Sequence, residues 1–527
     1  MNVLKPFLRA RLWLVAGCAF SLHPLIGRAA EVVWQKMPLL SPAAAAAGIT
    51  PGGEGAQWPR GPVVVSAANP DFLLLPIDVG GVYRSLDGGR EWNLAMAGWN
   101  ARGANGFAID PKNAAHVIGI GGNSMDWNPA WSTNSPNGLY RSDDQATHWQ
   151  QVLSVMPAIG GAVAFDPASY DAAKRICTRV YYAAYALGLY RSEDGGTHWE
   201  VVSQQPMGMA QADFNTTLLA VSARTGHVWL GGKTGLWLSR DQGVTFQRVS
   251  DGQPVYGLSL LEGTSDTIYT SGKAGIQRTV DEGKTWEPLA AQGVARQPSE
   301  PIRNLAVSPV DPQRMLCWVQ GANWQWVRYI SQDGGAHFAP IQFQVSPGEI
   351  LPRNGRNGYF TWHPTNPVVA YGLGGDWVTR STDGGRTFTW WNNGYNGIMV
   401  GASFNFSATA THVVFMGFQD YNGAFTTDGG RTWNYRDISG RGWGGHAYGA
   451  FAVDAQVMWY GDAEGWGSPR KTRISRDGGQ TWAFAHDLGG QECQWAGADV
   501  SCADPHDPNI LFASQWRSAD KGQTWNT

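Results

Sequence analysis

One eight-residue pattern recurs ten times along the chain and limits what it can fold into. The pattern is Ser/Thr-x-Asp-x-Gly-x-Thr-Trp/Phe, with clean copies such as SRDQGVTF from Ser239 and looser ones such as SDDQATHW from Ser142. The ten aspartates of the pattern are Asp87, Asp144, Asp194, Asp241, Asp281, Asp333, Asp383, Asp428, Asp477 and Asp520. They span 433 residues (520 − 87) in nine intervals. The repeat is therefore about 48 residues long, which is the length of one four-stranded propeller blade.

The chemistry of the pattern is that of a tight turn between two strands. Its Asp can accept hydrogen bonds from backbone N–H groups of the same turn, and its Gly can adopt a positive φ. Its Thr suits a strand, and its Trp or Phe supplies a large apolar plug. No amphipathic run is long enough for a major helix. The sequence therefore predicts an all-β fold, a β-propeller with about ten four-stranded blades, in which the repeat aspartates are structural.

The pattern resembles the Asp-box, or bacterial neuraminidase repeat, of several propeller families, and each copy is called a box below. In those families the box lies on the outer hairpin of a blade, away from the ligand face. Seven boxes precede residue 395 and three follow it. The favoured division is a seven-bladed propeller over residues 31–395 and the start of a second, incomplete propeller over residues 396–527. The alternative is a single ten-bladed propeller of the sortilin type.

The N-terminus has the features of an export signal. Lys5, Arg9 and Arg11 precede an apolar stretch that ends near Ile26, and small residues follow. Residues 1–30 are therefore predicted to be a signal peptide, and the protein to be secreted or periplasmic. The alternative is a lipid anchor on Cys18, within Val-Ala-Gly-Cys. No later segment holds eighteen uninterrupted apolar residues, so we expect no transmembrane segment.

Charge and cysteine content narrow the classes of partner. The net charge is −3 with no long basic run, which argues against nucleic acid and suits a neutral polymer. There is neither a Cys-x-x-Cys nor a His-Glu-x-x-His motif, so we expect no metal and no cofactor. Cys177 and Cys317 are expected to be buried, whereas Cys493 and Cys502 are close enough in sequence to pair. We expect a monomer.

Asp78 is the most informative single residue. It lies in LLLPIDVGGVYRSLDGG, nine residues before the first box Asp, with two glycines just after it. This segment resembles glycoside hydrolase family 74, inverting endoglucanases and xyloglucanases, in which a strand ending in Thr-Asp-Val/Ile-Gly-Gly-x-Tyr-Arg carries a catalytic aspartate. Here Ile77 replaces the Thr. The resemblance covers residues 55 to 200 well and later repeats only generically.

The second carboxylate of that family lies in an Asp-x-Gly-Gly-Phe segment at the start of a second propeller. The best match here is FMGFQDYNGAFTTDGG, which offers Asp420 eight residues before its box Asp. The match is imperfect because Asn422 takes the place of a Gly. Asp462, in YGDAEGWG, is a further candidate. The resemblance implies that Asp78 is the base and Asp420 the acid of an inverting pair, with carboxyl groups roughly 6.5–9.5 Å apart.

Several tryptophans outside the boxes lie in stretches rich in Gly, Asn and Pro, which are typical of loops. The faces of pyranose rings stack on aromatic rings, so a cleft lined with Trp suits a neutral polysaccharide. The predicted substrate-binding residues are Trp127, Trp131, Trp324, Trp326, Trp390 and Trp391. The alternative use of such rings is packing between blades.

Two functions remain open from the sequence. The first is an exported glycoside hydrolase that cleaves a β-1,4-glucan or xyloglucan-type polysaccharide with Asp78 and Asp420. The second is a non-catalytic Asp-box propeller that binds a polysaccharide or a protein partner, as sortilin-like and assembly-factor propellers do. The polymer and the endo or exo mode are left undecided.

Overall fold

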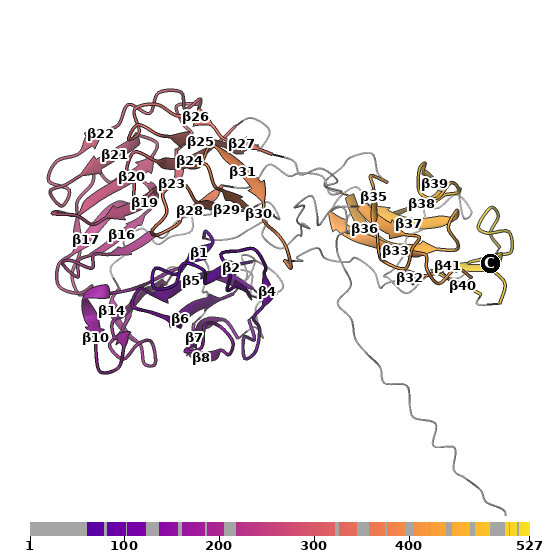
Figure 1. The fold of residues 1–527 in the computed structure, drawn as a ribbon, viewed down its shortest axis with the longest axis horizontal. Coiled ribbons are helices and arrows are strands. Elements are labelled where there is room, and N and C mark those ends of the chain that lie inside the picture. Colours follow the sequence, from indigo (N-terminus) through magenta and orange to yellow (C-terminus); the bar gives the residue numbers. More distant parts are fainter. Residues whose placement is uncertain are drawn as a thin grey trace, which may run out of the picture. The chain divides into compact units, whose positions relative to one another are not determined.

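The fold was obtained as a computed structural model (Figure 1). The described residues are 61–77, 82–101, 103–122, 136–155, 161–184, 187–204, 218–321, 326–344, 358–374, 377–395, 405–407, 409–420, 422–438, 445–463, 470–484, 501–504, 506–513 and 516–526. In a few strands only the backbone is described, notably at Asp420, His446 and Asp462. The predicted signal peptide, Cys18 and Cys493 lie outside these residues.

The described residues form strands throughout, with one short 3-10 helix, η1 (Pro167–Ser169). Most strands join into antiparallel four-stranded sheets made from consecutive segments, which confirms the predicted all-β propeller fold. The strands of the first seven sheets are β1 (Val64–Val65), β2 (Leu73–Pro76), β3 (Val82–Ser85), β4 (Asn93–Leu94); β5 (Ala104–Asp110), β6 (Asn113–Gly121), β7 (Gly138–Ser142), β8 (Gln150–Ser154); β9 (Ala162–Phe165), β12 (Val180–Ala184), β13 (Gly188–Ser192), β14 (Glu200–Ser203); β15 (Leu218–Val221), β16 (Val228–Gly232), β17 (Gly235–Ser239), β18 (Gln247–Arg248); β19 (Val255–Leu261), β20 (Thr267–Gly272), β21 (Gly275–Thr279), β22 (Glu287–Pro288); β23 (Arg303–Val307), β24 (Met315–Gln320), β25 (Trp326–Ser331), β26 (Ala339–Pro340); and β28 (Tyr359–Trp362), β29 (Ala370–Gly374), β30 (Trp377–Ser381), β31 (Thr387–Trp390).

Three further strands belong to this part of the chain. They are β10 (Tyr170–Asp171), β11 (Ile176–Cys177) and β27 (Gln342–Phe343), and β27 adds to the seventh sheet by pairing in parallel with β31. Residues 405–526 form β32 (Asn405–Phe406), β33 (Val414–Asp420), β34 (Asn422–Thr426), β35 (Asn434–Arg436), β36 (Gly445–Ala452), β37 (Met458–Ala463), β38 (Arg470–Ser475), β39 (Ala483–Phe484), β40 (Ser501–Ala503), β41 (Leu511–Ala513) and β42 (Trp516–Ser518).

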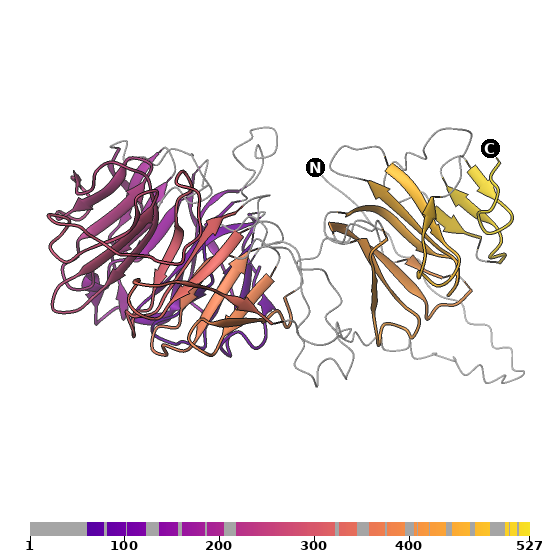
Figure 2. The same ribbon diagram turned by 90° about the horizontal axis from the view of Figure 1, so that it is seen from above.

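Hydrophobic clusters join each of the first seven sheets to the next. Each cluster draws buried side chains from two neighbouring sheets, from the first and second through to the sixth and seventh. One more cluster joins the seventh sheet back to the first, where Leu75 and Ile77 pack with Tyr371 and Leu373. Figures 1 and 2 show β28–β31 lying beside β1–β4. The seven sheets therefore form a complete cycle of packing contacts.

The junction between the first and seventh sheets is called the seam below, and among the described residues no strand is exchanged across it. The indole N–H of Trp92 donates to the carbonyl of Trp391 over 2.8 Å, and the backbone N–H of Trp92 donates to the carbonyl of Asn393 over 2.8 Å. The hydroxyl of Tyr371 donates to the carbonyl of Gly88 over 2.9 Å, and Tyr395 is buried in the same cluster. The predicted domain boundary at residue 395 and the number of blades remain predictions, which the seam supports.

In residues 405–526, β33 pairs with β36 and so joins two sets of four strands into one longer sheet. β40–β42 form a separate three-stranded sheet, and Asn526 makes an isolated bridge with Arg517 of β42. Cys177 and Cys317 are free and buried, as predicted.

Candidate functional site

All ten boxes make the same hydrogen bonds. The box hydroxyl donates to the box aspartate over 2.7–2.9 Å and accepts the backbone N–H four residues later over 2.7–2.9 Å. The aspartate also accepts the backbone N–H four residues beyond itself over 2.8–3.0 Å. The predicted positive φ occurs even at Ala146, which replaces the Gly of its box, with φ 61°. The box aspartates are therefore committed to their own turns.

Each sheet has two ends with different roles. Because consecutive strands alternate in direction, the box turn after the third strand shares one end with the turn between the first and second strands. The connection between the second and third strands lies at the opposite end. Asp78 falls between β2 and β3, Trp127 and Trp131 between β6 and β7, and Trp324 between β24 and β25. These four residues lie outside the described residues.

Asp420 is the last residue of β33, at the same end of its sheet. Its backbone pairs with Gly445 of β36. Asn422, which replaces a family Gly, is buried and adopts φ 61°, a left-handed conformation that Asn tolerates better than most residues. The amide of Asn422 donates to the hydroxyl of Tyr435 over 3.4 Å and to Asp437 over 3.3 Å. Although Asn422 departs from the family pattern, its backbone therefore has a conformation that Gly readily adopts.

Asp462 lies one strand further along, on β37, opposite Ala447 of β36 and opposite Lys471 of β38. The register thus separates Asp420 and Asp462 by the single strand β36. The side chains of both residues are outside the description, as is Asp78. The pairing of Asp78 with Asp420 consequently stays a prediction.

The three described tryptophans of the predicted set differ. Trp326 begins β25, is partly exposed, and stacks on Trp318 with ring centroids 4.1 Å apart and planes 11° from parallel. Trp391 follows β31 and lies against the seam, where a Cβ added to Gly89 would come within 3.0 Å of its ring. The prediction that Trp390 lies in a loop and binds the substrate is wrong. It is the last residue of β31 and only 4% exposed, because the strand alternation turns Phe388 and Trp390 into the protein.

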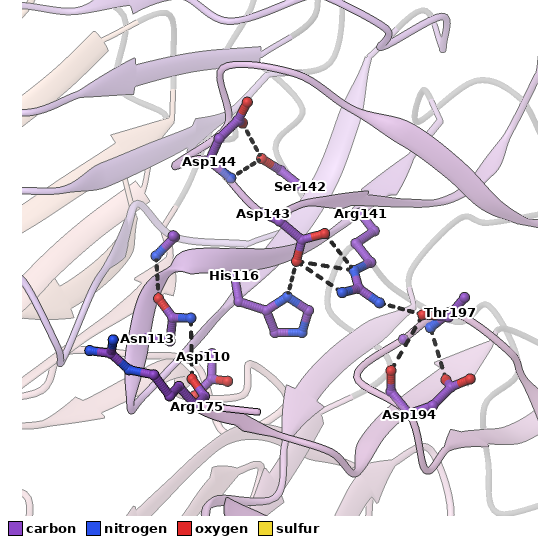
Figure 3. A network of polar contacts seen from close by, with 12 residues as sticks. Asp110, Asn113, His116, Arg141, Ser142, Asp143, Asp144, Arg175, Asp194 and Thr197 are labelled. Carbon is purple, nitrogen blue, oxygen red and sulfur yellow. Dashed lines mark hydrogen bonds and ion pairs between the residues drawn. The ribbon is translucent and has the colours of Figure 1, made fainter. Parts of the chain in front are cut away.

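A polar network at the junction of the second and third sheets was not foreseen (Figure 3). His116 is 1% exposed, and its Nδ1 lies 2.7 Å from Asp143. The hydrogen bond with His116, together with Arg141 at 3.0 Å, holds the pKa of Asp143 at about 2. Arg141 also donates to Thr197 of the next box. The network lies at the box end and its histidine is buried, so it fits the role of holding two sheets together.

Among the described residues, no group of three or more His, Cys, Asp or Glu side chains could hold a metal ion. The same part of the chain contains no helix of the length and apolar character required to span a bilayer.

No protein-family model matches the chain, and no curated protein matches it in sequence. Its fold is similar to three solved structures. A GH74 enzyme of Niastella koreensis matches with TM-score 0.60 and 17% identity, over 90% of this chain and 79% of that one. A GH74 xyloglucanase from Xanthomonas campestris matches with TM-score 0.58 and 16% identity, over 90% and 87%. An ancestral GH74 enzyme matches with TM-score 0.64 and 14% identity, over 94% and 69%. The chain therefore has a β-propeller fold like that of the GH74 structures.

Proposed function

We propose that this protein is an exported glycoside hydrolase that cleaves a neutral β-1,4-glucan or xyloglucan-type polysaccharide with inversion. The proposal is supported by a fold like that of the GH74 structures, combined with two sequence segments, around Asp78 and Asp420, that resemble the catalytic segments of that family. Residues 1–30 act as the export signal, and the protein works as a monomer without a cofactor.

In the proposed reaction, one carboxyl group acts as the general base and the other as the general acid. Asp78, ionised, takes a proton from a water molecule that attacks the anomeric carbon. Asp420, protonated, gives its proton to the leaving glycosidic oxygen. The acid needs a raised pKa, which comes from burial or from a neighbouring negative charge. The two groups stand roughly 6.5–9.5 Å apart, which leaves room for the water.

We favour Asp420 over Asp462 as the acid because the segment around Asp420 is the best match to the second catalytic segment of the family, despite Asn422 in the place of a Gly.

The test is the release of reducing sugar from xyloglucan, mixed-linkage β-glucan and carboxymethylcellulose, with NMR to identify the anomer formed first. We expect cleavage of one polymer with inversion, and a loss of at least about 100-fold in kcat for Asp78→Asn and Asp420→Asn. Asp462→Asn is the matched control and should retain activity. A parent protein that is inert on all three polymers would reject the hydrolase and favour the binding propeller.

A further inference from the structure

A continuous stack of side chains crosses two sheets at the end opposite the boxes. The guanidinium carbon of Arg303 lies 4.9 Å from the ring centre of Tyr256 and 5.4 Å from that of Trp318. Both distances are within the range of cation–π attraction. Trp318 in turn stacks on Trp326 at 4.1 Å. We call Tyr256, Arg303, Trp318 and Trp326 the ring column.

Only the ends of the ring column reach solvent. Arg303 is 7% exposed and Trp318 is 3% exposed, whereas Trp326 is partly exposed. The indole N–H of Trp318 has no hydrogen-bond partner among the described residues, which is unfavourable for a buried donor. Trp318 therefore serves as a flat apolar backing for Trp326.

The equivalent positions in other sheets show whether the fold itself requires Trp318 and Trp326. Trp318 stands three residues after the residue paired with the box hydroxyl, and the same position in the third to fifth sheets holds Ala183, Gly231 and Ser271. Trp326 stands five residues before its box hydroxyl, where those sheets hold Leu187, Thr234 and Ala274. The packing of a sheet thus does not require an aromatic ring at either position. Positions at which one repeat differs from the others in this way are expected at functional sites.

The seventh sheet fixes the column from the other side. A Cβ added to Gly358 would lie 2.8 Å from Trp318 and 2.9 Å from Trp326, so the backbone touches both rings. Tyr359 meets Trp326 edge to face with centroids 6.3 Å apart. Trp326 is consequently held in one orientation before any ligand arrives, which lowers the entropic cost of binding.

We propose that Arg303 and Trp318 are positioning residues that hold Trp326 as a stacking platform for a pyranose ring. This inference rests on the proposed function for its ligand class, a neutral polysaccharide. In this proposal Arg303 increases the affinity for the ligand, because it holds Trp318 and, through Trp318, Trp326. Arg303 takes no part in bond cleavage.

The test measures binding of the full chain to xyloglucan and to cellohexaose, by affinity electrophoresis and by tryptophan fluorescence. We expect Trp326→Ala to weaken binding about tenfold and Arg303→Met and Gly358→Ala to weaken it several-fold, since a stacked ring contributes about a factor of ten. On any polymer that is cleaved, Arg303→Met raises KM and leaves kcat unchanged. Arg303→Lys restores most of the affinity because it keeps the charge. The control is Tyr170→Ala, which removes an exposed ring at the box end.

The outcomes separate the two proposals. If the parent protein binds the polysaccharide but does not cleave it, the proposed hydrolase activity is rejected, whereas the proposed role of the ring column in binding is retained. A parent that cleaves, with Trp326→Ala and Arg303→Met binding as tightly as the parent, overturns the column alone. Absence of binding to either ligand overturns the column. Should Arg303→Met not fold, Gly358→Ala carries the same comparison.

Discussion

The box aspartate combines two kinds of hydrogen bond in one small turn. At Asp281 the hydroxyl of Thr285 donates over 2.6 Å and its backbone N–H over 2.9 Å. Both bonds favour the ionised carboxylate and hold the pKa of Asp281 at about 2. Asp428, Asp477 and Asp520 show the same shift with the same first cause.

Stability is therefore expected to fall in acid. The folded pKa of about 2 lies below the value of about 3.9 for an unfolded aspartate, so the stabilisation is complete above pH ~5 and is lost progressively as the pH falls to 2 and below. Urea unfolding at pH 5 and at pH 2.5 should show a lower midpoint at pH 2.5. The variant Asp281→Asn should show a smaller difference between the two pH values. An equal difference in parent and variant would contradict the role given to this carboxylate.

How far single residues could be predicted depended on whether their partners were local. The box aspartates were predicted correctly because every partner lies within four residues. His116 and Asp143 are 27 residues apart and the ring column spans Tyr256 to Trp326, so neither grouping has a local pattern. The burial of Trp390 did have a signal, since Thr387 to Trp390 alternates polar and apolar residues.

At the scale of the sheet, each of the first seven sheets is built from consecutive strands, and neighbouring sheets are joined mainly by side chains. The seam shows this most clearly, because Trp92 reaches across to the carbonyl of Trp391. Sequence periodicity predicted the sheets and favoured a first propeller that ends at residue 395, but it left open a ten-bladed ring in which the first and seventh sheets would not meet. That contact joins residues almost 300 positions apart, and only the completed cycle brings them together.

Removing the hydrogen bond across the seam should weaken this joint measurably. The variant Trp92→Phe keeps a ring in the cluster but removes the N–H that donates to the carbonyl of Trp391. We expect a loss of about 1 kcal/mol or more in the free energy of unfolding, measured by urea denaturation. The control Tyr170→Phe alters a residue that is 42% exposed and should change stability by less than about 0.5 kcal/mol. Equal losses in both variants would argue against the seam.

At the scale of the molecule, we predict that the seven-sheet cycle can fold independently. Its sheets pack in a complete cycle and Tyr395 at its end is buried in the seam, while one further cluster, of Trp390, Phe418 and Ala424, links the seventh sheet to the strands that follow. A chain limited to residues 61–395 should therefore fold and unfold in one cooperative transition, followed by calorimetry and near-ultraviolet circular dichroism. A fragment without such a transition would favour the single ten-bladed alternative. The full-length chain provides the reference.

Among the described residues no strand is exchanged at the seam, and this has a consequence for how such a molecule can arise and change. Each of the first seven sheets takes its strands from one continuous stretch, so duplicating or deleting one repeat of about 48 residues in a gene adds or removes a complete sheet. None of the surviving sheets loses a strand in such an event. Only one junction must find a new neighbour, and here that junction is closed by indole rings and loop carbonyls. Lineages built on this repeat can therefore vary in blade number by remodelling a single interface.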